Sequence, residues 1–281
     1  MARTAVLTAL ALLAFAANSL LCRAALGPRL IDPASFTLIR LLSGAVVLAL
    51  LDRLRKASKD ATAAVPEIVA PVALFAYAIA FSFGYLRLTA ATGALLVFGA
   101  VQVTMLAAAV HAGERPRIAA WLGTAVAIAG LVGLTLPGLD APDPVGAGLM
   151  AVAGVSWGIY SLRGRAARDP IAASARNFAW SVPLALAIGF ARTAAVGSAP
   201  LETQGLLLAV ASGGIASGLG YAAWYTVLPA LGATRAAVLQ LSVPVITAGL
   251  AVLLLGEALS VRLVVSSVAV LGGIALVVRY R

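Results

Sequence analysis

The feature that most constrains this chain of 281 residues is a succession of apolar stretches, each long enough to cross a lipid bilayer. A transmembrane helix needs about 20 consecutive apolar residues. Ten such helices are predicted, over residues 4–22, 33–51, 68–86, 91–110, 118–136, 145–162, 171–191, 204–224, 234–255 and 261–278. Only 11% of the residues are charged, against about 25% in soluble domains. The sequence therefore predicts an all-α polytopic membrane protein embedded in a lipid bilayer, and it excludes a soluble enzyme, a disordered protein and a nucleic-acid-binding protein.

The distribution of the 20 Lys and Arg residues indicates how the chain is oriented. Cytoplasmic loops of membrane proteins carry an excess of these residues. With the N-terminus in the cytoplasm, 13 of them fall on cytoplasmic segments, five on the opposite side and two within spans. Both termini are therefore predicted to be cytoplasmic. The first stretch also resembles a signal peptide with a cleavage site at Ala14-Phe15-Ala16, but the further spans that follow favour an uncleaved helix.

The two halves of the chain share a pattern. The second and seventh spans each begin with Asp-Pro and contain one arginine, and the fourth and ninth each run from a threonine to a Gly-Glu pair. The matched positions are Asp32 and Asp169, Pro33 and Pro170, Arg40 and Arg176, Thr92 and Thr234, and Glu114 and Glu257. Five spans per half is an odd number, so the second half enters the membrane from the opposite side, as in the inverted repeats of many transporters. We predict two inverted five-helix repeats, over residues 1–137 and 138–281.

A family resemblance rests on three segments of the second half. Pro229-Ala-Leu-Gly-Ala-Thr234, Gly256-Glu257 and Gly272-Gly273 resemble the C-terminal module of the EamA-type branch of the drug/metabolite transporter superfamily, and Gly113-Glu114 ends a paired module in the first half. The resemblance implies a bacterial inner-membrane exporter of amino acids, including aromatic ones, or of similar small metabolites. We expect alternating access by a monomer that needs no cofactor. A multidrug or nucleoside-type exporter on the same fold is an alternative, and a membrane enzyme or a non-transporting scaffold is an alternative of another class.

The charged residues bear on how transport would be driven. All ten acidic residues fall in loops or at span ends. Carboxylates inside the membrane are the usual proton relays of coupled pumps, so uncoupled facilitation or exchange is expected. Arg40 and Arg176 are the two charges inside spans, where a charge needs solvation or a partner. Either arginine could attract a substrate carboxylate, or each could anchor the bundle by hydrogen bonds to neighbouring carbonyl groups.

Polar and aromatic residues near the middle of the spans are predicted to line a substrate cavity, because buried amides and hydroxyls need partners in lipid. The predicted set is Asn18, Ser19, Tyr77, Phe81, Phe98, Gln102, Trp157, Tyr160, Trp180, Gln240 and Ser242. Aromatic walls with a few polar groups suit amino acids and related metabolites. Tyr221, Trp224 and Tyr225 are interpreted instead as anchors at the membrane interface.

Small residues and prolines are candidates for packing and movement. Gly154 and Gly158, and likewise Gly214 and Gly218, have the four-residue spacing that lets helices approach closely. Pro183 and Pro244 are hinge candidates because each removes a backbone donor.

No catalytic or metal site is predicted. The segment 154–158 also matches the hydrolase nucleophile motif Gly-x-Ser-x-Gly, but that motif requires a strand–turn–helix context and a histidine partner. The chain contains one histidine and one cysteine, which leaves no basis for a catalytic triad or for a metal site.

Overall fold

The computed structural model of the chain describes residues 2–55, 68–113, 117–136, 141–164, 167, 169–197 and 200–280, with the side chains of 196, 229, 232–238, 278 and 280 left aside. The predicted repeat boundary at 137/138 and Glu114 lie outside the described residues. The helices are α1 Ala2–Leu26, α2 Pro33–Leu54, α3 Val69–Tyr85, α4 Ala90–His111, α5 Ile118–Thr135, α6 Pro144–Gly164, α7 Pro170–Val196, α8 Thr203–Val210, the π-helix η1 Ala211–Leu219, α9 Gly220–Gln240, α10 Ser242–Leu255 and α11 Val261–Tyr280.

The predicted helical class and helix count are confirmed. Because α8, η1 and α9 follow one another without a break, the described residues form ten helical rods. Within them, seven apolar segments are long enough to cross a membrane, and the helices Val69–Tyr85, Ser242–Leu255 and Val261–Val277 are shorter but apolar. The only β-pairing in the described part of the chain is an isolated bridge between Ile31 and Leu201.

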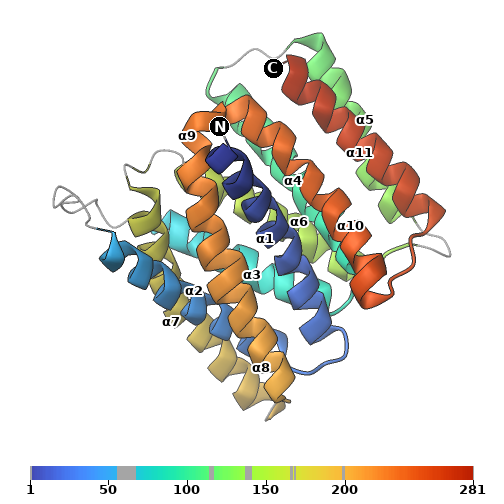
Figure 1. The fold of residues 1–281 in the computed structure, drawn as a ribbon. Helices are drawn as coiled ribbons and strands as arrows, with labels where there is room; N and C mark the ends of the chain where they lie inside the picture. Colours follow the sequence, from blue (N-terminus) through green and yellow to red (C-terminus); the bar gives the residue numbers. More distant parts are fainter. Residues whose placement is uncertain are drawn as a thin grey trace.

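The predicted boundary between the eighth and ninth spans falls inside a helix. Residues 226–233 belong to α9 and do not form an extended link, but the chain reverses its direction within α9 before it continues into α10 (Figure 1). Proline and glycine weaken a helix, but tertiary context routinely overrides this preference. Pro244 lies in the first turn of α10, just after the break at Leu241 between α9 and α10. Its missing N–H would have bonded the carbonyl group of Gln240, the last residue of α9, so the proline accounts for this break.

Helices from the two halves of the chain pack together throughout the bundle (Figure 1). One edge is formed by α5 packed on α11, and another part by α2 packed on α7. Between them, α3 and α4 pack on α6, while α1 packs on η1, α9 and α10. The first turn of α1 and the last turn of α11 lie toward the same end of the bundle in this view. The centre of the bundle is therefore built by both halves.

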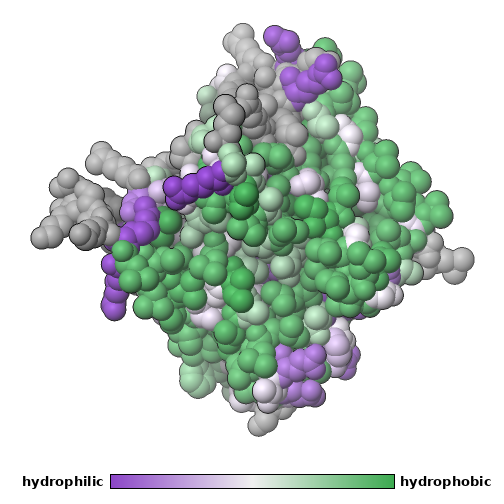
Figure 2. Space-filling view, in the orientation of Figure 1, coloured by the Kyte–Doolittle hydropathy of each residue, from purple (hydrophilic) through white to green (hydrophobic). Residues whose placement is uncertain are grey.

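The outer surface has the character expected of a membrane protein. Figure 2 shows hydrophobic side chains over the broad middle of this face and hydrophilic side chains at its margins. Many large apolar side chains are exposed, among them Leu253, Leu207 and Phe190. A soluble monomer rarely exposes such an extensive apolar surface. This surface is therefore suited to contact with lipid.

Helices α2 and α7 begin in the same way. Asp32 and Asp169 are the N-caps, and each is followed by a proline that suits the first helical position. The Asp32 carboxylate accepts hydrogen bonds from two backbone N–H groups at 2.9 and 3.2 Å, and that of Asp169 accepts two at 3.1 and 3.2 Å. Each aspartate also pairs with an arginine near the end of the other helix, Arg192 with Asp32 at 3.1 Å and Arg55 with Asp169 at 3.5 Å. The two helices are thereby clamped at both ends.

Candidate functional site

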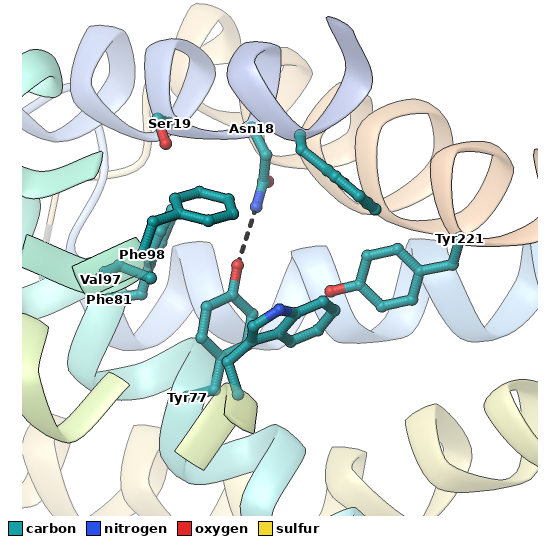
Figure 3. Close-up of a pocket in the computed structure, with 9 residues that line it drawn as sticks. Asn18, Ser19, Tyr77, Phe81, Val97, Phe98 and Tyr221 are labelled. Atoms are coloured by element: carbon teal, nitrogen blue, oxygen red, sulfur yellow. Dashed lines mark hydrogen bonds between the residues drawn. The ribbon is translucent and has the colours of Figure 1, made fainter. Parts of the chain in front are cut away.

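A pocket lies at the centre of the bundle, where five helices meet (Figure 3). Its lining comprises Phe15, Asn18 and Ser19 from α1, Tyr77 and Phe81 from α3, Val97 and Phe98 from α4, Trp157 from α6, and Tyr221 from α9. The free space at its centre holds about one water molecule. A larger ligand therefore requires helices or side chains around the site to move apart.

Aromatic rings form most of the pocket wall. The Trp157 ring lies 5.0 Å from the rings of both Tyr77 and Tyr221 and 6.4 Å from that of Phe15, measured between ring centroids. Tyr77 lies 5.1 Å from Phe81. Contacts of this kind stabilise the packing by about 0.5–1.5 kcal/mol each beyond the area that they bury. The wall fits a ligand with a flat or apolar body.

A short chain of polar groups crosses the pocket. The Asn18 side-chain amide donates to the Tyr77 hydroxyl at 3.2 Å, and the Ser212 hydroxyl donates to the Asn18 carbonyl oxygen at 2.6 Å. A second donor, the Arg40 guanidinium, reaches the same Tyr77 oxygen at 2.9 Å. The Tyr77 hydroxyl therefore accepts two hydrogen bonds, which occupies its two lone pairs.

Arg40 is a buried positive charge next to this pocket. It is 1% exposed, its Nε donates to the Ser217 hydroxyl at 3.3 Å, and its Nη1 has no hydrogen-bond partner. The guanidinium carbon lies 5.0 Å from the centre of the Tyr77 ring and 5.1 Å from that of Phe81. No ion pair between Arg40 and a carboxylate occurs among the described residues. Among the described residues, this charge is therefore stabilised by hydroxyls and aromatic faces and not by a carboxylate.

The π-helix η1 supplies two of these hydroxyls. Ser212 and Ser217 are both fully buried, and they bond Asn18 of α1 and Arg40 of α2 respectively. Residues five apart lie about 140° apart around an α-helix, but a π-helix, with its i→i+5 hydrogen bonds, brings them near one another. The π-helical winding therefore turns both serines toward the first half of the chain.

An ion pair closes the bundle at the end of α1. The Glu257 carboxylate accepts from the backbone N–H of Ala90, at 2.9 and 3.0 Å, and lies 3.3 Å from Arg23 Nε. Glu257 thus caps the start of α4 and ties it to the segment between α10 and α11. Gly256 ends α10 in the left-handed conformation, which glycine adopts without strain. Arg23 follows Asn18 by five residues, so this closure lies about 7.5 Å from the pocket along α1.

The pocket unites six of the predicted cavity residues, and the others lie elsewhere. The six are Asn18, Ser19, Tyr77, Phe81, Phe98 and Trp157. Tyr160 is buried beside the pocket, with its ring 5.4 Å from Trp157. Gln240 is buried and Gln102 and Ser242 are half-buried, but these three do not line the pocket. Trp180 is 63% exposed on the outer surface.

The two intramembrane arginines differ, although they were predicted as a matched pair. Arg40 is buried beside the pocket, whereas Arg176 is exposed on the outer face of α7. A long arginine side chain on that face can extend its charged end toward the membrane interface. Only Arg40 is placed to act on a ligand in the pocket.

The predicted packing and hinge residues also separate. Gly154 and Gly158 of α6 face α4, since a Cβ at these positions would meet Ala100 and Thr104 respectively. Gly214 and Gly218 belong to η1 and lie near Val47 of α2. Pro183 lies inside α7, whereas Pro244 lies in the first turn of α10, next to the break between α9 and α10.

Several site residues were not predicted. Tyr221 was interpreted as an interfacial anchor, but it is 3% exposed, lines the pocket, and its hydroxyl has no hydrogen-bond partner. Phe15, Ser212 and Ser217 were not singled out. The missed signal is the five-residue spacing of the two serines in a Gly-rich segment, which is informative only once the π-helix is known. No cluster of three or more His, Cys, Asp or Glu that could hold a metal is found in the described part of the chain.

Comparison with known proteins agrees with this architecture. Residues 144–279 match the EamA-like transporter family. An uncharacterised protein of Pseudomonas aeruginosa PAO1 is 51% identical over 99% of this chain and 96% of its own length. One solved crystal structure resembles the fold with a TM-score of 0.69 at 21% identity, covering 97% of this chain and 98% of that chain. With its apolar helices and lipid-compatible surface, the chain is a multi-pass membrane protein, and it belongs to the EamA-like transporter family of the drug/metabolite transporter superfamily.

Proposed function

We propose that this protein exports amino acids or similar small metabolites across the bacterial inner membrane by alternating access. The observation that carries the proposal is the central pocket, which takes its lining from α1, α3 and α4 of one half and from α6 and α9 of the other. A site between two halves can open to either side when they tilt against each other. The packing of each half on the other supports the predicted inverted repeats.

The pocket chemistry fits small amphipathic substrates. Phe98, Trp157 and Tyr221 offer apolar faces, and Asn18 and Tyr77 offer hydrogen-bonding groups within the same space. Binding sites for small molecules commonly combine apolar walls with a few placed polar groups. An aromatic or aliphatic amino acid has the matching combination of an apolar side chain and a compact polar end.

Transport without proton coupling is part of the proposal. The described carboxylates lie at helix ends: Asp32, Asp169 and Glu202 are N-caps, Asp52 lies in the last turn of α2, and Asp143 and Glu257 lie next to α6 and α10. An acid inside the membrane is the usual proton relay of a coupled transporter. The concentration gradient of the substrate is then the driving force.

Alternating access requires one gate at each end of the bundle. The ion pair between Arg23 and Glu257 forms one of these two gates. In this conformation Glu257 joins α1 and α4 to the loop after α10. Opening that end requires the loss of this ion pair, while the other end closes. We propose that Glu257 is a latch that opens and closes during each cycle of transport.

The test is counterflow of radiolabelled amino acids in proteoliposomes that contain the purified protein. Replacement of Trp157 by Ala should lower exchange about tenfold or more, since it removes the central wall of the pocket. The matched control is Trp180→Ala, which makes the same change on the outer surface and should exchange at the wild-type rate.

Three outcomes would overturn parts of the proposal. If no amino acid exchanges while a nucleoside or a cationic drug does, the substrate claim is wrong and the multidrug or nucleoside-type alternative replaces it. If Trp157→Ala exchanges like the wild type, the site is wrong. A strict requirement for a pH gradient would contradict the uncoupled mechanism.

A further inference from the structure

The free hydrogen-bonding capacity of the pocket consists largely of donors. The Tyr77 oxygen already accepts from Arg40 and from Asn18, so its own O–H proton is left to donate into the pocket. The Asn18 amide nitrogen donates one N–H to Tyr77, and no bond from its second N–H to another described residue is found. Tyr221 adds a buried hydroxyl with no partner, which can donate or accept. A ligand that satisfies the Tyr77 hydroxyl and the Asn18 N–H must present acceptors.

The electrostatics favour an acceptor with a negative charge. Arg40 brings a full positive charge to the Tyr77 hydroxyl, and no carboxylate of the described residues pairs with it. Four other arginines form ion pairs near helix ends: Arg23 with Glu257, Arg55 with Asp169, Arg87 with Asp143 and Arg192 with Asp32. A buried charge is costly unless it is paired or hydrogen-bonded. Nη1 of Arg40 has no hydrogen-bond partner among the described residues.

We infer that the substrate carries a carboxylate, and that Tyr77 receives this carboxylate while Arg40 supplies the compensating charge from behind. The inference rests on the proposed function and specifies its substrate class. The Tyr77 hydroxyl donates its proton to a carboxylate oxygen, and the Arg40 guanidinium holds the phenol oxygen from the other side. Asn18 donates its free N–H to the same carboxylate, and the apolar part of the substrate lies against Trp157 and Phe98.

This arrangement makes the site selective by charge. A carboxylate gains charge-assisted hydrogen bonds, which are about twice as strong as neutral ones. A cationic amine in the same place meets like charge, and the Tyr77 oxygen has no lone pair left to accept from it. Arg40 is therefore a specificity-determining residue that acts through the Tyr77 hydroxyl.

The experiment compares three probes with the same phenyl ring and chain and different ends: 3-phenylpropionate, 3-phenylpropionamide and 2-phenylethylamine. Binding to the purified full-length protein in detergent is followed by the fluorescence of Trp157, with Trp121, Trp180 and Trp224 replaced by Phe. We expect 3-phenylpropionate to bind about tenfold or more tightly than either of the other probes. Arg40→Gln and Tyr77→Phe should each remove most of this preference, and Arg176→Gln should leave it unchanged.

Arg40→Lys is the second variant, because it keeps the charge if Arg40→Gln does not fold. It should bind the carboxylate more weakly than the wild type but still in preference to the amine. Equal affinities for the three probes, no binding of any probe, or a carboxylate preference that persists in both Arg40→Gln and Tyr77→Phe would overturn the inference. Amino acid counterflow decides the proposed function separately. If amino acids exchange but the protein shows no preference for a carboxylate, only this inference is contradicted. If the protein prefers a carboxylate but no amino acid exchanges, only the assignment of amino acids as substrates is contradicted.

Discussion

Helices α2 and α7 start from nearly the same sequence pattern and end in different roles. Each begins with an Asp-Pro pair in which the aspartate caps the helix, and each carries near its end the arginine that pairs with the aspartate of the other helix. The start and the end of the two helices are therefore equivalent. Their arginines inside the membrane are not.

A difference of one residue in register separates the two arginines. Arg40 follows Asp32 by eight residues, whereas Arg176 follows Asp169 by seven. One residue turns a side chain by about 100° around an α-helix, which is enough to move it from the interior to the outer face. The residue that occupies the position of Arg40 in α7 is Asn177, which is half-buried. The two helices thus match at their ends, but only α2 holds its arginine in the interior of the bundle.

Helices α2 and α7 also differ in what they pack against. The buried side of α2 packs on the π-helix, which has no counterpart in the other described helices, and receives Ser217 from it. Much of α7, in contrast, is exposed on the outside of the bundle, including Trp180 and Phe190. Local sequence resemblance therefore does not decide which face of a repeat helix becomes functional.

The largest effect is expected from adding a methyl group where α2 meets the π-helix. A Cβ at Gly213 would overlap the Arg40 carbonyl oxygen and the Ser43 hydroxyl, so Gly213→Ala should destabilise the protein by about 3 kcal/mol or more. In α7, Gly189 has no atom within 4 Å of such a Cβ, and Gly189→Ala should stabilise the helix by up to about 1 kcal/mol. Thermal unfolding in detergent measures both. Equal effects of the two substitutions would show that α2 and α7 are packed alike.

Substitutions of the two capping aspartates should differ less in their effect on stability than the two glycine substitutions do. The Asp32 carboxylate is buried and paired with Arg192, so we expect Asp32→Ala to cost about 2 kcal/mol or more. The Asp169 carboxylate is partly exposed and paired with a half-exposed Arg55, so Asp169→Ala should cost only about 1 kcal/mol. Unfolding temperatures of the two variants and of the matched Asp→Asn changes, which keep the cap, separate the two contributions. A larger loss for Asp169→Ala would contradict the difference in burial.

The smallest effect is expected at Arg176. Its side chain is exposed on the outer face of α7, so Arg176→Gln should change the free energy of unfolding by no more than about 0.5 kcal/mol. The unfolding temperature and the rate of amino acid counterflow should both match the wild type. A loss of transport in this variant would mean that the second arginine also acts on the substrate, and that the two repeats are functionally equivalent after all.

The sequence by itself determined the class of this protein and the ends of most helices. Hydrophobic length alone requires helices in lipid, where each backbone polar group needs an internal partner. Asp-Pro pairs mark the starts of α2 and α7, as expected of an aspartate cap followed by proline. The pattern also singled out most of the pocket lining, because amides and hydroxyls inside apolar spans need a partner or a cavity. At the predicted boundary 226–233 the chain stays helical while α9 reverses its direction (Figure 1), because proline and glycine only weaken a helix and tertiary contacts decide whether it continues.

Only the tertiary structure decided which residues share the pocket. Periodicity along one helix cannot tell which side will face a partner helix when nearly all residues are apolar. Asn18, Tyr77 and Arg40 lie on three helices and are joined only by packing, and the π-helical winding that turns Ser212 and Ser217 toward them leaves no mark in hydropathy. Arg40 and Arg176 show the same limit. The sequence places both arginines at similar depth and contains the one-residue shift that turns their side chains about 100° apart, but only the neighbouring helices decide which of the two directions faces the interior.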